Sequence, residues 1–199
     1  MIPVTGWPLL LASFGLGIAH AFDADHLAAV TALASERPQW RRAMGCAIHW
    51  ALGHGTAVVT LGLLLIATPL GGILDGSGAD LMVGVALLAL GLWTAWNGYH
   101  GQQPRDRWPR ALAGAFGLLH GTAGVATVLG LLGVARGSTL SGLSSLAAFS
   151  AGVFAAMFVL AVGLGSLYQR IGVNERWRSV VQMGIGVATM LIGVSMLIP

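Results

Sequence analysis

The chain alternates between long apolar stretches and short polar segments. Six stretches are apolar enough to cross the hydrocarbon core of a membrane as helices of about 20 residues. They cover residues 8–34, 43–68, 81–99, 111–135, 143–168 and 179–198. The pattern predicts an all-α polytopic membrane protein with six transmembrane helices, in a single transmembrane domain over residues 1–199. Because Met1–Trp7 lacks the basic start of a signal peptide, we expect the first stretch to be a retained helix.

The charged residues lie almost entirely between these stretches. With six crossings, the segments 35–42, 100–110 and 169–178 face the same side of the membrane. These segments hold nine of the ten arginines, and the opposite side holds only Arg136. The positive-inside rule therefore predicts that the three segments are cytoplasmic and that both termini lie outside. This is the topology expected of a multi-pass protein of the cytoplasmic (inner) membrane.

Composition excludes several classes of protein. The chain is 56% hydrophobic and only 9% charged, whereas soluble domains carry about 25% charged residues. Its basic residues are all arginines in short loops, so the net charge of +3 does not indicate nucleic-acid binding. Without a lysine, the chain has neither the P-loop of an ATPase nor a Schiff-base amine. Cys46 is the one cysteine, which excludes an intrachain disulfide and a thiolate-rich metal site.

The segment His20-Ala-Phe-Asp-Ala-Asp-His26 places two imidazoles and two carboxylates inside the first apolar stretch. One ionisable side chain at membrane depth costs about 2.5–3.5 kcal/mol on insertion scales. Histidine and aspartate are also ligands for Ni, Co or Zn. On a regular helix His20, Asp23 and His26 share a face and Asp25 points away. Either the helix is distorted around an ion, or Asp25 orients an imidazole. A hydrogen-bonded cluster without metal is the alternative.

Two further histidines lie in predicted membrane spans. His54 stands between Gly53 and Gly55, which permit close approach of another backbone or of an ion. His120 is followed by Gly121 and is a ligand, an orienting group or a packing contact. We expect Trp50 to be a packing residue. The predicted metal-site residues are His20, Asp23, Asp25, His26, His54 and His120.

A short repeat divides the chain into two halves. The sequence Gly-Ile-Ala-His-Ala at 17–21 recurs as Gly-Leu-Leu-His-Gly at 117–121. Each copy opens a unit of three predicted spans, in residues 1–100 and 101–199. Three is an odd number of crossings, so the second unit is expected to be inverted relative to the first. Inverted repeats with a polar site near the midplane are a recurrent transporter design.

These motifs resemble those of the nickel/cobalt transporter family. Residues 20–26 resemble its H-A-x-D-A-D-H signature, and Leu52–Val59 is similar to its second motif, a Gly-His-Ser/Thr-Val-Val element. The short length and the His120-Gly121 element resemble the small nickel permeases associated with urease maturation.

The resemblance implies uptake of Ni(II) or Co(II) as the transported substrate across the cytoplasmic membrane, with no prosthetic group. It also implies a nickel-enzyme maturation system downstream, and it assigns His20, Asp25, His26 and His54 to the binding site. Three other functions are alternatives. One is a membrane-embedded zinc hydrolase with a metal-bound water, although the chain has no His-Glu-x-x-His segment. Another is a b-haem electron carrier with two axial histidines on facing helices, although carboxylates beside those histidines would be unusual. The third is a metal exporter on the same scaffold.

Overall fold

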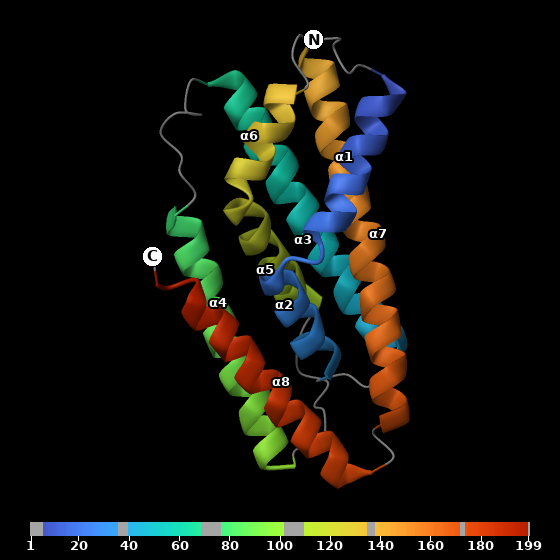
Figure 1. Ribbon diagram of the computed structural model, residues 1–199, viewed down its shortest axis with the longest axis vertical. Helices are drawn as coiled ribbons and strands as arrows, with labels where there is room; N and C mark the ends of the chain where they lie inside the picture. The colour runs from blue at the N-terminus through green and yellow to red at the C-terminus, as the bar shows by residue number, and fades with distance from the viewer. Residues whose placement is uncertain are drawn as a thin grey trace.

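The computed structural model describes residues 6–35, 40–68, 77–101, 110–134, 138–171 and 174–198. Within these ranges every regular element is a helix, and no strand is present (Figure 1). The elements are α1 (Trp7–His20), α2 (Ala24–Ser35), α3 (Trp40–Ala67), α4 (Ser77–Tyr99), α5 (Arg110–Ala123), α6 (Val125–Val134), α7 (Thr139–Ile171) and α8 (Glu175–Ser195).

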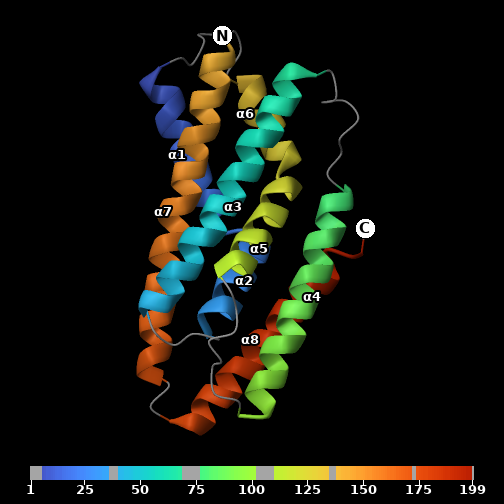
Figure 2. The same cartoon turned by 180° about the vertical axis from the view of Figure 1, so that it is seen from behind.

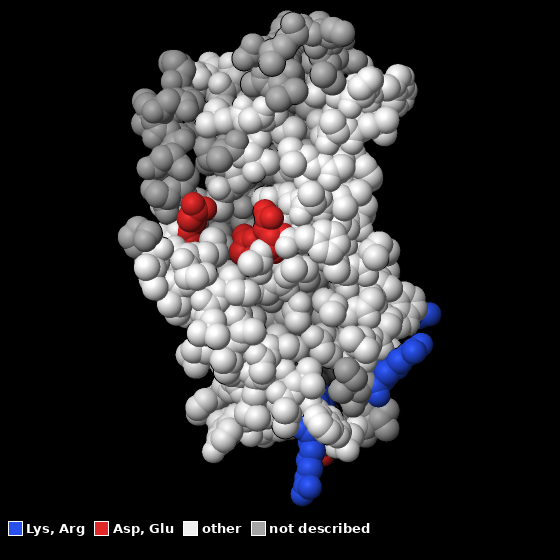
Figure 3. All heavy atoms as spheres, viewed as in Figure 1, with Lys and Arg blue, Asp and Glu red and all other residues white. Residues whose placement is uncertain are grey.

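The helices lie along one long axis and alternate in direction (Figures 1 and 2). α1 and α2 run one way, α3 returns, α4 runs back, α5 and α6 return, and α7 and α8 complete the bundle. We call the end where α2, α4 and α7 finish and α3, α5 and α8 begin the basic end. Figure 3 shows basic side chains gathered toward it. Its described arginines are Arg41, Arg110, Arg170, Arg176 and Arg178.

Four helices of the described chain are long and apolar enough to cross a membrane. They are Ala43–Ala67, Gly78–Tyr99, Thr139–Arg170 and Glu175–Ser195. The pair of α1 and α2, bent by 61°, is a fifth candidate if it forms one span. This agrees with a multi-pass helical membrane protein. The predicted total of six spans, their inverted repeat and their orientation stay predictions.

Two stretches expected as single helices are broken. The stretch 8–34 bends over Ala21–Asp23, and the stretch 111–135 is interrupted at Gly124. At the first break the amide of Phe22 donates to the carbonyl of Ala19 at 3.0 Å. The amide of Asp23 likewise donates to the carbonyl of His20 at 3.0 Å. The chain therefore turns without leaving these amides unbonded, which is required in a membrane interior.

Glycines bring pairs of helices into backbone contact. Gly17 of α1 lies against the carbonyl of Phe149 on α7, so closely that a Cβ atom would overlap it. Gly117 of α5 lies in the same way against the carbonyl of Trp50 on α3. The two glycines are 100 positions apart, and Phe149 and Trp50 are 99 positions apart. The two halves of the chain thus build α1–α7 and α5–α3 with matching contacts.

A second set of glycine contacts shows the same correspondence between the two halves of the chain. Gly53 of α3 lies against the carbonyl of Gly114 on α5, and Gly152 of α7 lies against the carbonyl of Phe14 on α1. These positions again differ by 99 and 100. Small residues at helix crossings are the usual means of close packing in membranes. The contacts hold the ends of α1 and α5, with their histidines, against the middle of the bundle.

Candidate metal site

Three histidines from three helices meet where α1 breaks. His20 ends α1, His26 lies in the first turn of α2, and His54 lies in the middle of α3. Each offers a ring nitrogen, and these three atoms lie within 4.8 Å of one another. The ring centres are 4.6 Å apart for His20 and His26, and 5.3 Å apart for His26 and His54. Imidazole nitrogens at this spacing form a geometry that could hold one metal ion.

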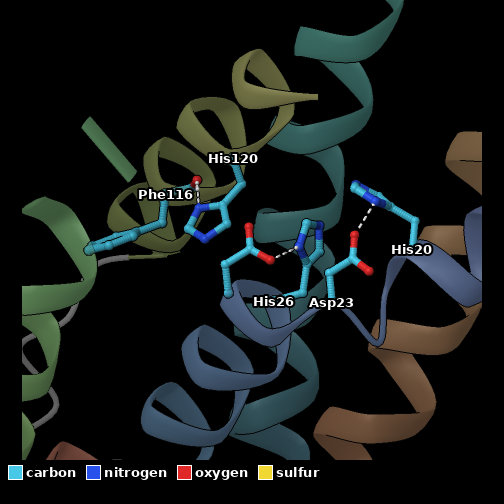
Figure 4. Close-up of polar contacts among 6 residues, drawn as sticks. His20, Asp23, His26, Phe116 and His120 are labelled. Carbon is cyan, nitrogen blue, oxygen red and sulfur yellow. Dashed lines mark hydrogen bonds and ion pairs between the residues drawn. The ribbon is translucent and has the colours of Figure 1, made fainter. Parts of the chain in front are cut away.

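Two carboxylates contact the outer nitrogens of these rings. His20 Nδ1 lies 2.6 Å from Asp23 Oδ2, and His26 Nδ1 lies 3.2 Å from Asp25 Oδ1 (Figure 4). When Nδ1 carries the proton and donates it to the carboxylate, the lone pair lies on Nε2. This arrangement orients metal-binding histidines in many proteins. The helix is broken at this segment and Asp25 contacts His26, so the geometry is compatible with both alternatives raised by the sequence, and the role of these residues toward a metal stays a prediction.

His120 lies beside this group from α5. Its Nδ1 is 2.9 Å from the carbonyl of Phe116, to which it donates (Figure 4). Its ring centre is 5.5 Å from that of His26. It does not belong to the set of three whose ligand atoms lie within 4.8 Å. Because Nδ1 donates, the lone pair of His120 lies on Nε2.

The deep side of the site is buried and rich in unpartnered nitrogens. His26, His54 and His120 are each 1% exposed. Among the described residues, Nε2 of His26, Nε2 of His120 and both ring nitrogens of His54 have no hydrogen-bond partner. A buried polar atom left without a partner costs about 1–3 kcal/mol. Several such atoms close together could be satisfied by a metal ion, which accepts lone pairs from ring nitrogens.

The opposite side of the site is more open. The side chain of His20 is 15% exposed and that of Asp23 is 55% exposed, whereas Asp25 is 19% exposed. Acidic side chains gather on this face of the molecule, over the start of α4 and near the turn between α1 and α2 (Figure 3). The site is therefore reached from the α1–α2 turn.

The structure adds an aromatic neighbour whose role the sequence did not indicate. Trp50, expected as a packing residue, stacks on His54 with ring centres 5.1 Å apart and planes inclined by 17°. It also lies 5.1 Å from His26 and 5.8 Å from His120, measured between ring centres. Trp50 precedes His54 by four residues, so helical spacing alone places both on one face.

Comparisons with known proteins agree with the ligand chemistry. Residues 6–93 match the NicO family, described as high-affinity nickel-transport protein. A 56-residue segment is 45% identical to the cobalt transport protein NhlF of Rhodococcus rhodochrous. That segment is 27% of this chain and spans only 15% of the relative's length. No solved structure matches the chain. Both names denote transporters rather than enzymes.

Proposed function

We propose that the protein transports a divalent transition-metal cation, Ni(II) or Co(II), through a site inside the membrane. One observation carries the proposal: one ring nitrogen from each of His20, His26 and His54 lies within 4.8 Å of the other two, in an apolar helical bundle. The proposed site residues are His20, Asp23, Asp25, His26, His54 and His120. The match to a nickel-transport family and the likeness to a cobalt transport protein support these two metals.

The nitrogen and oxygen atoms of these side chains are suitable ligands for Ni(II) or Co(II). Nitrogen and oxygen donors suit Ni(II), Co(II) and Zn(II), whereas Cu(I) prefers sulfur. Nε2 of His20, His26 and His54 would bind the ion directly. Asp23 and Asp25 hold the rings through Nδ1, and their negative charges offset part of the double charge of the ion. His120 would replace a departing water or ligand as the ion moves inward.

The chain is proposed to cross the membrane six times as two inverted units. The matched contacts of Gly17 with Phe149 and of Gly117 with Trp50 support this arrangement. The broken pair α5 and α6 then corresponds to the broken pair α1 and α2, and His120 corresponds to His20. The arginines of the basic end support a cytoplasmic location for that end. Uptake is then movement from the α1–α2 turn toward the basic end.

Transport of nickel by the reconstituted protein tests this function. Purified protein in liposomes is exposed to nickel, and accumulation inside is measured over time. His54→Ala removes a ligand that is 1% exposed and is expected to lower the initial rate at least about tenfold. His100→Ala is the matched control, because His100 is exposed and stacks on Trp96 outside the site. An equal rate in His54→Ala and wild type would refute the proposal.

A further inference from the structure

An apolar column leads from the histidines to the basic end. Residues of α2, α3 and α7 enclose it, and on α3 they run from Trp50, beside the histidines, to Ala43 near the basic end. Four of the residues that line it are alanines, Ala34, Ala43, Ala47 and Ala161, each at most 5% exposed. The remaining open space in the column is about 10 Å³, which is about one water molecule. No hydrated cation passes through a channel this narrow.

Trp50 lies at the top of this column. Its side chain is 1% exposed, and its ring contacts the imidazoles on one side and lines the column on the other. Its indole Nε1 has no hydrogen-bond partner in the part of the chain that the structure describes, where stacking and packing hold the ring. Its backbone is fixed by the contact with Gly117. The side chain can therefore swing about a fixed backbone without breaking a hydrogen bond.

The other half of the chain holds an aromatic residue in the matching place. Phe149 of α7 is 1% exposed, its carbonyl lies against Gly17, and its ring centre is 5.3 Å from that of His20. Gly17 precedes His20 by one helical turn on α1, and Gly117 precedes His120 by one turn on α5. Since α1 and α5 run in opposite directions, Phe149 and Trp50 border the histidines from opposite sides.

We propose that Trp50 is the gate between the metal site and the basic end, and that the α2–α3–α7 column is the route the ion takes when the gate opens. The inference rests on the proposed transport function. In the structure the site is exposed on the side of Asp23 and closed on the side of Trp50. Movement of the indole away from His54 joins the site to the column. The alanines lining the column leave room for a small ion once neighbouring side chains shift.

The chain carries its own reporter for this gate. Cys46, the one cysteine, is 7% exposed and lines the column one turn beyond Trp50. The experiment adds a membrane-impermeant methanethiosulfonate to the α1–α2 side of the protein in liposomes, and mass spectrometry measures the labelled fraction. We expect slow labelling in wild type and at least tenfold faster labelling in Trp50→Ala. Trp50→Phe, which keeps an aromatic ring, is expected to stay close to wild type.

Phe149→Ala is the matched control, because it removes an equally buried aromatic ring on the other side of the histidines. Its labelling rate at Cys46 is expected to equal that of wild type. Unfolding of Trp50→Ala would also expose Cys46, but nickel slows labelling only if the reagent passes through an intact site. Cys46 that stays protected in Trp50→Ala, or labelling that nickel leaves unchanged, would overturn the gate.

A second variant tests whether the ion passes through the column, while Trp50 stays in place. Ala161→Leu fills the column, so nickel should still bind to the purified protein while the transport rate falls at least tenfold. Ala151→Leu adds the same bulk at an exposed position of α7 and is expected to transport normally. Normal transport by Ala161→Leu would exclude the column as the route. Failure of wild-type protein to bind nickel would instead refute the proposed function. The effect of nickel on labelling would then not count against the gate, which the labelling rates of Trp50→Ala and Phe149→Ala without nickel would still test.

Discussion

The two carboxylates that contact the imidazoles differ in burial, and this difference predicts unequal effects on metal affinity. Asp23 is closer to its partner, at 2.6 Å from His20, but is 55% exposed. Asp25 is 3.2 Å from His26 and only 19% exposed. We therefore expect Asp25→Asn to weaken nickel binding more than Asp23→Asn does, although its contact is the longer one.

The magnitude follows from the distance and the surroundings. With an imidazole ring and a metal–nitrogen bond of about 2.1 Å between them, each carboxylate would lie about 7 Å from the ion. A single negative charge and a double positive charge at that distance attract by about 5 kcal/mol at an effective dielectric constant of about 20, and by about 1 kcal/mol in water. The first value is a ceiling for Asp25, and the second describes the exposed Asp23.

Measured effects of losing an orienting partner of a metal ligand are about 10–100-fold in affinity. We expect Asp25→Asn to fall in this range and Asp23→Asn to fall below about tenfold. Equilibrium dialysis of the purified variants against radioactive nickel measures both dissociation constants under one set of conditions. A larger loss in Asp23→Asn would show that hydrogen-bond length, and not burial, governs the contribution, and would refute the electrostatic reasoning.

Three further predictions concern packing and protonation. Gly53→Ala should lower the melting temperature of the purified protein, because the added Cβ would overlap the backbone of α5 and overpacking costs about 1–3 kcal/mol. In Gly55→Ala the added Cβ would contact only the side chain of Ser150, with Cβ at 3.6 Å, so the melting temperature should be unchanged or higher. Gly91→Ala should separate α4 from α8 and lower the melting temperature, since its Cβ would lie 2.6 Å from the carbonyl oxygen of Gly186. In Gly184→Ala the added Cβ would have no atom within 4 Å, so equal melting temperatures for these two variants would contradict the packing. The amount of nickel bound to the purified protein in equilibrium dialysis should fall as the pH is lowered from about 7.5 to about 5.5, because imidazoles bind metal only when deprotonated. Equal amounts of bound nickel at both pH values would argue against histidine ligands.

The sequence indicated which side chains lie close together better than it indicated the shape of the helices. Clustered polar residues in an apolar stretch are informative because membrane burial is costly, and His20, His26 and His54 do meet. The break over Ala21–Asp23 was raised only as one of two alternatives, and the break at Gly124 was not predicted, because hydropathy averages over a stretch and is insensitive to a local change of direction.

The placement of Trp50 depended on information that one helix alone does not contain. Its spacing from His54 gives a shared face, but the direction of that face is set by the contacts of Gly53 and Gly117 between α3 and α5. The position of His120 depends on the same contacts. Glycine is frequent throughout the chain, so its role at a crossing is recognised only when the partner helix is known.

X-ray absorption spectroscopy of the nickel-loaded protein tests the central claim most directly. We predict nitrogen and oxygen neighbours with outer-shell scattering from at least three imidazoles, in agreement with the convergence of His20, His26 and His54. The signal should be lost in His54→Ala. Sulfur scattering from Cys46, or bound nickel without imidazole scattering, would contradict the assignment of the metal to this site.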